Sequence, residues 1–170
     1  KIIFTIISIS LFLFFIILFD SLKINRVYNT EELVGKPIPS INLEYLNEDK
    51  YFNTSDLSKN QFTLINFFSS WCGPCRKEHK YLISLSEKNL KIVGINFKDK
   101  KQNANQFLND LGNPYYLTLK DNTGKKSVDF GVYGIPETIL INKNLLIIKK
   151  YIGPIDKKDM NEILRSSGIK

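Results

Sequence analysis

The sequence predicts an α/β domain with a mixed central sheet flanked by helices, preceded by one transmembrane helix. Three features carry this prediction: an uncharged apolar run at the N-terminus, strand-length apolar runs alternating with segments of helical period, and a last pair of strands joined by a short turn. The chain has 170 residues, of which 43% are hydrophobic and 24% charged. This composition fits one folded core with an appendage and excludes collagen-like, disordered and disulfide-scaffold proteins.

The N-terminal segment is long and apolar enough to cross a membrane. Residues 2–19 carry no charge, and a helix of that length spans about 27 Å, close to the hydrocarbon thickness of a bilayer. A cleaved signal peptide has a shorter apolar region and ends in a small-x-small site, which the flank from Phe19 to Lys23 does not offer. We therefore expect residues 1–19 to be an uncleaved signal anchor, residues 20–33 a polar linker and residues 34–170 one domain.

The first half of the domain is expected to contain a strand, helix, strand unit. Residues 35–39 form an extended approach with an alternating strand after it, and residues 61–68 are apolar enough for a strand buried on both faces. Apolar side chains at helical spacing predict a helix over residues 75–88, and residues 91–97 return to strand character.

The second half is expected to add an insertion and a hairpin. A helix over residues 103–111 is stopped by Gly-Asn-Pro and followed by an additional strand over residues 115–119. Strands at 137–142 and 145–152 are joined by a two-residue turn, so the sheet is mixed rather than all parallel. A last helix starts near the N-cap residue Asp156 and runs to Arg165, before Gly168.

Two cysteines and one histidine limit the chemistry. A zinc site made from Cys72, Cys75 and His79 would need a carboxylate to complete it, and iron–sulfur clusters need four thiolates. Attachment of a c-type haem would need histidine at the position of Arg76. We therefore expect no metal and no cofactor, and a dithiol that can close on itself.

The dithiol lies between a predicted strand and a predicted helix. This position places Cys72 at the amino end of the helix, where free N–H groups and the helix dipole stabilise a thiolate. We expect Cys72 to be the nucleophile and Cys75, one turn further, to be the more buried resolving thiol that closes the disulfide and releases the substrate. The alternative is an inert disulfide or a pair of buried thiols.

Two segments resemble the active site of thioredoxins. Residues 71–75 read Trp-Cys-Gly-Pro-Cys, and residues 134–136 read Gly-Ile-Pro, as in the loop that carries a cis proline opposite the dithiol in that superfamily. The resemblance implies a thioredoxin-like fold, a redox-active Cys72–Cys75 disulfide and a cis peptide bond before Pro136. The chain departs from ordinary thioredoxins at Asn66, where they carry a buried aspartate that moves protons for the second cysteine, and by an insertion between residues 96 and 136.

Together with the anchor, two further segments resemble the DsbE/CcmG family of cytochrome c biogenesis thioredoxins, within the TlpA-like branch. They are residues 131–138, Gly-Val-Tyr-Gly-Ile-Pro-Glu-Thr, and residues 94–99, Gly-Ile-Asn-Phe-Lys-Asp. The resemblance implies a substrate groove beside the dithiol, formed by Trp71, Gly73, Pro74, Tyr133, Ile135, Pro136 and Glu137.

In that family acidic groups beside the dithiol tune its second cysteine, and Glu78 and Glu137 match their positions. We expect these carboxylates to raise the pKa of a nearby thiol by like-charge repulsion and to supply the proton handling that Asn66 cannot. Without the resemblance, Glu78 would be interpreted as a solvated helix charge and Glu137 as an acid at a strand end.

Three other function classes are less well supported. The net charge of +7 would suit an anionic partner, but the lysines are spread along the chain, so we expect no nucleic acid partner. A Cys–His hydrolase would need His79 near Cys72, yet on one helix they lie about 10 Å apart, so we expect His79 at the surface. A peroxiredoxin needs a lone peroxide-reactive cysteine, whereas both cysteines here lie in one pair.

The resemblance implies a thiol:disulfide oxidoreductase anchored by a single span in the bacterial inner membrane, with its domain in the periplasm. It would reduce the Cys-x-x-Cys disulfide of apocytochrome c, with electrons from a membrane thiol carrier such as DsbD or CcdA, and we expect a monomer. One alternative is a general TlpA-like periplasmic reductase. Another, of a different class, is a holder that binds apocytochrome c without redox chemistry.

Overall fold

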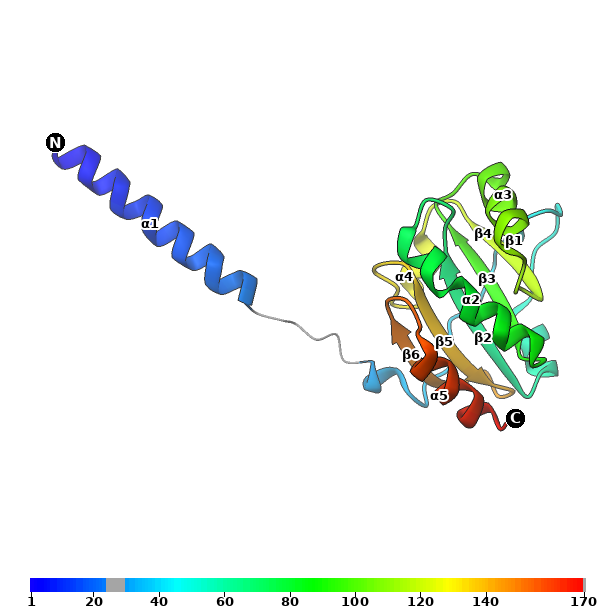
Figure 1. Ribbon diagram of the computed structural model, residues 1–170. Coiled ribbons are helices and arrows are strands. Elements are labelled where there is room, and N and C mark those ends of the chain that lie inside the picture. The colour runs from blue at the N-terminus through cyan, green and yellow to red at the C-terminus, as the bar shows by residue number, and fades with distance from the viewer. Residues whose placement is uncertain (24–29, 170) are drawn as a thin grey trace.

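Six strands form one mixed sheet in the computed structural model, which describes residues 1–23 and 30–169 (Figure 1). The sheet order is β1-β4-β3-β2-β5-β6, in which β2, β3 and β4 run parallel. β1 pairs antiparallel with β4, β5 pairs antiparallel with β2, and β6 pairs antiparallel with β5. This confirms the predicted α/β class. The strands are β1 (Glu44–Tyr45), β2 (Phe62–Phe68), β3 (Lys91–Phe97), β4 (Leu117–Asp121), β5 (Glu137–Asn142) and β6 (Ile147–Ile152).

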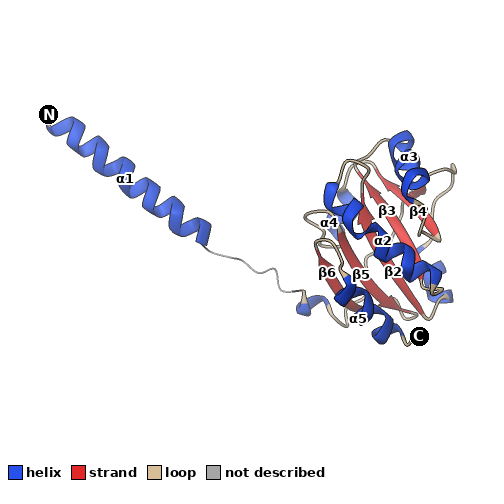
Figure 2. Ribbon diagram, in the orientation of Figure 1, coloured by secondary structure: helices blue, strands red, loops and turns tan. Residues whose placement is uncertain are grey.

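Helices cover both faces of the sheet (Figure 2). Because side chains alternate along β2, Leu64 and Phe68 pack on one face against α2 (Gly73–Glu87), α3 (Lys101–Leu111) and α5 (Lys157–Ser167). Ile65 and Phe67 pack on the other face. They are covered by apolar side chains of residues 38–57, which precede β2, and by Phe130, which follows α4 (Lys125–Asp129). As a consequence β2 is buried on both sides, as its apolar run predicts.

The N-terminal apolar segment forms α1 (Ile2–Lys23), and its 20 residues from Ile2 to Ser21 have a mean hydropathy of 3.0. Its length and composition are those of a helix that can cross a membrane, which is compatible with a single-pass anchor. The helix continues past Phe19 to Lys23, because extending a formed helix adds one hydrogen bond for each residue fixed. Residues 24–29 of the predicted linker lie outside the described residues, and Glu31–Leu33 form a short 3-10 helix, η1.

Several predicted bounds are confirmed and others move. The bounds of β3 and β5 match the prediction. The helix α5 has the predicted Asp156 N-cap, but it ends at Ser167, two residues beyond the predicted end at Arg165, with Gly168 as its C-cap. The predicted strand around Ile41 is reduced to β1, because the Ile41 N–H donates to Thr54 Oγ1 (2.6 Å) instead of to a neighbouring strand. The helix α4 was not predicted, since five residues carry no readable period.

The strand of the insertion also starts later than predicted. The Tyr115 N–H donates to the Asn113 side chain (3.0 Å), so the turn after α3 extends to Tyr115 and β4 begins at Leu117. Conversely, α2 begins two residues before the predicted start, since Cys72 serves as the N-cap and Pro74 fits the first turn of a helix. Both shifts affect the position of residues at the candidate site.

Candidate active site

The two cysteines form a disulfide at the start of α2, with their sulfurs 2.01 Å apart. Cys72 Sγ accepts a hydrogen bond from the backbone N–H of Cys75 at 3.1 Å. A sulfur at the N-cap of a helix receives both that N–H and the positive end of the helix dipole, which favour thiolate over thiol. Cys72 therefore has the electrostatic environment expected of the attacking sulfur. In the disulfide form both cysteines are buried, Cys72 at 3% and Cys75 at 1% exposed.

The proline loop between α4 and β5 faces this disulfide. The peptide bond Ile135–Pro136 is cis, as the resemblance implied, and the Ile135 carbonyl oxygen lies 3.7 Å from Cys72 Sγ. A hollow of about 320 Å³ lies beside the loop. It is lined by Tyr133, Gly134, Ile135, Pro136, Glu137, Ile152 and Gly153.

Aromatic side chains are exposed next to both halves of the site. Trp71 precedes the disulfide and is 59% exposed, while Tyr133 in the proline loop is 75% exposed. Gly73 and Pro74, the other predicted groove residues, are also exposed at the start of α2. Exposed aromatic rings beside a reactive group favour contact with a partner chain.

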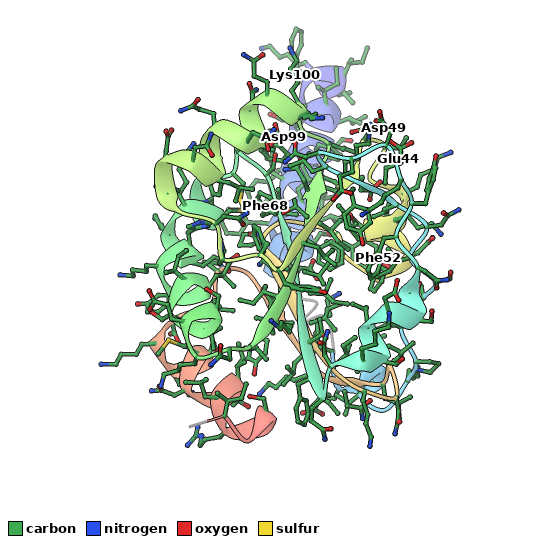
Figure 3. All side chains as sticks on the ribbon, turned by 90° about the vertical axis from the view of Figure 1, so that its right-hand side faces the viewer. Glu44, Asp49, Phe52, Phe68, Asp99 and Lys100 are labelled. Carbon is green, nitrogen blue, oxygen red and sulfur yellow. A yellow bond between two sulfur atoms is a disulfide. The ribbon has the colours of Figure 1, made fainter. Side chains whose placement is uncertain are left out.

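A second loop supports the residues before Cys72. Asp99 lies just beyond β3 and accepts hydrogen bonds from the Ser70 N–H (2.7 Å) and the Ser70 hydroxyl (2.9 Å) (Figure 3). Burial opposes ionisation of Asp99, but hydrogen bonds from Ser70, Asn96 and Lys100 outweigh it and hold the pKa of this carboxyl below its usual value. The Trp71 indole also donates to the Lys98 carbonyl (3.1 Å). The segment 98–100 thereby fixes the backbone leading into the disulfide, although the sequence alone gave its residues no role.

Glu78 is fully buried, one helical turn after Cys75 on the inner side of α2. Its Oε1 accepts from Asn66 Nδ2 (2.8 Å) and its Oε2 from the Ile155 N–H (2.9 Å). Burial raises the pKa of Glu78 to about 7, and the two hydrogen bonds act in the opposite direction. The interpretation as a solvated helix charge is therefore wrong, and the carboxyl titrates near neutral pH, where proton exchange is most effective.

Glu137 follows the cis proline and is also buried. Its Oε1 accepts from the backbone N–H groups of Tyr133 (3.1 Å) and Gly134 (3.3 Å), and its Oε2 lies 2.7 Å from Lys150 Nζ. The lysine offsets the charge of Glu137, so like-charge repulsion of a thiol by this carboxylate is weakened. The contacts of Glu137 instead fix the backbone of the proline loop.

Sequence reasoning missed Lys150. Its side chain is fully buried in β6, and Nζ donates to the carbonyls of Gly131 (2.6 Å) and Phe130 (3.3 Å) in addition to pairing with Glu137. The only available signal was a lysine within an apolar strand opposite a strand that starts with glutamate. Lys150 and Glu137 together tie the proline loop to the last two strands.

The predicted surface position of His79 is wrong. The side chain is 3% exposed, its Nε2 lies 2.8 Å from the Gly112 carbonyl oxygen, and its ring packs edge-on against Phe107 of α3. The inserted helix α3 covers this side of α2, which the helical period of α2 cannot reveal. Burial lowers the pKa of His79, opposed by the Gly112 hydrogen bond and aided by the charge of Arg76.

Within residues 1–23 and 30–169, no group of three or more His, Cys, Asp and Glu side chains is placed to hold a metal ion. The chemistry that the described site can perform is that of its two sulfurs, with a buried carboxyl on α2 one helical turn after Cys75.

Comparisons with known proteins agree with this geometry. The family model described as Redoxin matches residues 33–164. The chain is 41% identical over 132 residues to the thiol:disulfide interchange protein DsbE of Vibrio cholerae serotype O1, covering 78% of this chain and 72% of the relative. It is 38% identical over 167 residues to the protein of the same name from Yersinia pestis, covering 93% and 88%. The crystal structure of a DsbF homologue from Corynebacterium diphtheriae matches with a TM-score of 0.67 and 26% identity, covering 76% of this chain and 85% of that one.

Proposed function

The chain belongs to the DsbE family of thiol:disulfide interchange proteins and is a thiol-disulfide oxidoreductase with a Redoxin domain, and from this we propose that it reduces the Cys-x-x-Cys disulfide of apocytochrome c. The observation that carries the proposal is the placement of Cys72 Sγ at a helix N-cap, 3.7 Å from the carbonyl of Ile135. An extended substrate strand lying along that loop would bring its own disulfide to the sulfur.

The reaction proceeds through one mixed disulfide. The Cys72 thiolate attacks a substrate sulfur, so that the Cys72–substrate bond forms, the substrate disulfide breaks and its other sulfur leaves as a thiolate. Cys75 then gives its proton to Glu78 and attacks Cys72 Sγ, which expels the first substrate sulfur as a second thiolate. Two electrons pass to the substrate, and its two thiolates take up two protons, one returned by Glu78 and one from water. The enzyme is left with the Cys72–Cys75 disulfide.

The reducing direction is supported by the residues between the cysteines. Gly73 and Pro74 are the pair found in reducing thioredoxins, whose potential is about −270 mV. A protein of that potential in an oxidising compartment needs an external supply of electrons. A membrane thiol carrier of the DsbD or CcdA type would provide it by the same exchange run in reverse on the Cys72–Cys75 disulfide.

The proposed location is supported by the apolar N-terminal helix. We assign residues 1–19 to a single-pass anchor in the inner membrane, residues 20–33 to a linker and residues 34–170 to a monomeric periplasmic domain. The mean hydropathy of 3.0 over Ile2–Ser21 supports the anchor. The periplasmic side suits the proposed substrate, because disulfides persist in an oxidising compartment and are rare in the cytoplasm.

Trapping of the mixed disulfide tests the proposal. Full-length protein with Cys75→Ser, reduced and mixed with an oxidised Cys-x-x-Cys-His peptide from an apocytochrome c, is expected to form a covalent complex through Cys72, because the resolving thiol is gone. The matched control carries Cys72→Ser and forms no such complex.

The two alternatives are distinguished by peptide trapping and by a cytochrome c maturation assay. Equal trapping of unrelated periplasmic disulfide peptides indicates a general TlpA-like reductase. Full cytochrome c maturation by a protein with Cys72→Ser and Cys75→Ser indicates a holder that binds without redox chemistry. Either result contradicts the proposed function.

A further inference from the structure

Tyr115, from the inserted segment between α3 and β4, joins a buried polar network formed by Asn66, Glu78 and Thr138. Its hydroxyl donates to Asn66 Oδ1 at 2.8 Å. The amide group of Asn66 donates in turn to Glu78 Oε1 (2.8 Å) and to Thr138 Oγ1 (3.0 Å). Asn66, Glu78 and Thr138 are all completely buried, so these hydrogen bonds exchange no partners with bulk water.

The sheet is shaped to admit this tyrosine. Asn66 of β2 lies opposite Gly94 of β3, and a Cβ atom at position 94 would be 2.8 Å from the Tyr115 ring. No real Cβ contact is that short, so a side chain at Gly94 would push the ring away from Asn66. The ring is also stacked on Phe68, with centroids 4.7 Å apart. The glycine and Phe68 together direct the hydroxyl to the amide.

We propose that Tyr115 is a positioning residue for proton exchange in the active site, because its hydroxyl fixes the Asn66 amide with the nitrogen toward Glu78. This inference rests on the proposed function in one respect, namely that Glu78 takes the proton of Cys75. An amide can present either its carbonyl or its nitrogen to a neighbour, and the two orientations favour opposite protonation states of a carboxyl.

The hydroxyl of Tyr115 selects between these orientations. With Nδ2 facing Glu78, Asn66 donates to the carboxylate and so supports its charged form. In the reversed orientation Oδ1 would face Glu78 and accept from the protonated carboxyl, while the Tyr115 hydroxyl proton would lose the acceptor that it has on Asn66. Burial, and then the charge of Glu78, raises the pKa of Tyr115 well above its usual value, so the hydroxyl remains a donor.

Replacing Tyr115 by phenylalanine removes the hydroxyl and keeps the ring that packs on Phe68. The Asn66 amide can then turn and accept from protonated Glu78, so the titration midpoint of Glu78 is expected to rise by at least about half a pH unit. The midpoint is measured by carbon NMR of the carboxyl group in oxidised full-length protein in detergent micelles, with the signal assigned by its loss in Glu78→Gln.

A neighbouring tyrosine provides the matched control. Tyr116 is 61% exposed, and Tyr116→Phe is expected to leave the midpoint of Glu78 unchanged. In a background of Asn66→Ala, adding Tyr115→Phe is expected to cause no further shift, because Tyr115 acts only through the amide.

An unchanged midpoint in Tyr115→Phe overturns the proposal, and so does an equal shift with and without Asn66. The titration uses oxidised protein and no substrate. A failure of the proposed function, seen as the absence of a trapped complex with Cys75→Ser, is therefore distinguishable from a failure of this inference.

Discussion

We propose that Asn66 and Glu78 together take the place of the buried aspartate that ordinary thioredoxins carry. The amide of Asn66 cannot titrate, but it donates to Glu78, which burial brings to a pKa of about 7. A group that titrates near the working pH is suited to take a proton from a thiol and return it. Glu78 lies on α2, one turn after Cys75, whereas the aspartate of ordinary thioredoxins occupies the position of Asn66 on β2.

Glu78→Gln is expected to slow the step that releases the substrate by about tenfold or more, because general bases contribute about 10²–10⁴-fold to such steps. Trp71 is the only tryptophan of the chain and lies beside Cys72, so stopped-flow fluorescence can follow the mixed disulfide. The first attack by Cys72 should keep its rate, which serves as an internal control. Equal release rates in both proteins from pH 6 to pH 8 would show that Glu78 does not handle the proton.

The same carboxyl makes stability depend on pH. The pKa of Glu78 in the folded chain is about 7, above the ordinary value of 4.5. At a pH between these two values, the folded state keeps a proton on Glu78 that the unfolded state has lost. The free energy of unfolding should therefore fall as pH rises from about 4.5 to 7, by up to about 3 kcal/mol. Urea unfolding of oxidised protein measures this slope, and Glu78→Gln, which has no titrating carboxyl, should flatten it.

The proline loop that faces the disulfide is held by the buried ion pair between Glu137 of β5 and Lys150 of β6. Lys150→Met would leave Glu137 buried without its cation, which costs about 3–5 kcal/mol in comparable sites. Lys149→Met is the matched control, since the adjacent Lys149 pairs with Glu162 where both side chains are partly exposed, and such pairs contribute at most about 1 kcal/mol. Equal losses of unfolding free energy in the two variants would contradict the role given to Lys150.

The contact between α2 and α3 gives a second dependence on pH, opposite in sign. The lowered pKa of His79 means that the folded state binds its proton less readily than the unfolded state does. The lowered pKa of His79 has no effect on stability well above pH 6.5, the ordinary pKa of histidine. As pH falls below that value, it lowers the free energy of unfolding. In a Glu78→Gln background, the free energy of unfolding should decrease from pH 7 to pH 5, and His79→Gln should remove the decrease. A decrease of the same size in both proteins would rule out His79 as its source.

Along the whole chain, local sequence patterns predicted most helices and strands but did not show the contacts between them. The strands at Lys91–Phe97 and Glu137–Asn142 have the predicted bounds because turn residues end their apolar runs, and α5 has its predicted N-cap Asp156. The position of His79 was wrong because the period of one helix does not show which neighbour covers it.

The same limit applies to the candidate site. Cys72 and Cys75 were identified because their motif is continuous in the sequence and fixes a helix N-terminus. The bonds of Tyr115 to Asn66 and of Lys150 to Glu137 join residues 49 and 13 positions apart, and no local pattern marks such pairs. Only tertiary packing brings them together.

The proposed anchor and its orientation are properties of the whole chain. Protease added to intact spheroplasts is expected to digest the domain while the same domain, expressed without residues 1–23, stays protected in the cytoplasm. Protection of the full-length protein in intact spheroplasts, with digestion only after lysis, would place the domain on the cytoplasmic side.

The proposed reaction depends most on the thiolate of Cys72 at the start of α2. The pH titration of this thiol is the most direct test. Reduced full-length protein is alkylated with iodoacetamide across pH 4–10, and mass spectrometry locates the modified cysteine. We predict that Cys72 reacts first, with a midpoint at about pH 7 or lower, because the N–H of Cys75 and the helix dipole stabilise its anion. Reaction of Cys75 first, or a midpoint for Cys72 at the ordinary thiol value of about 8.5, would contradict the role of Cys72 as the attacking thiolate.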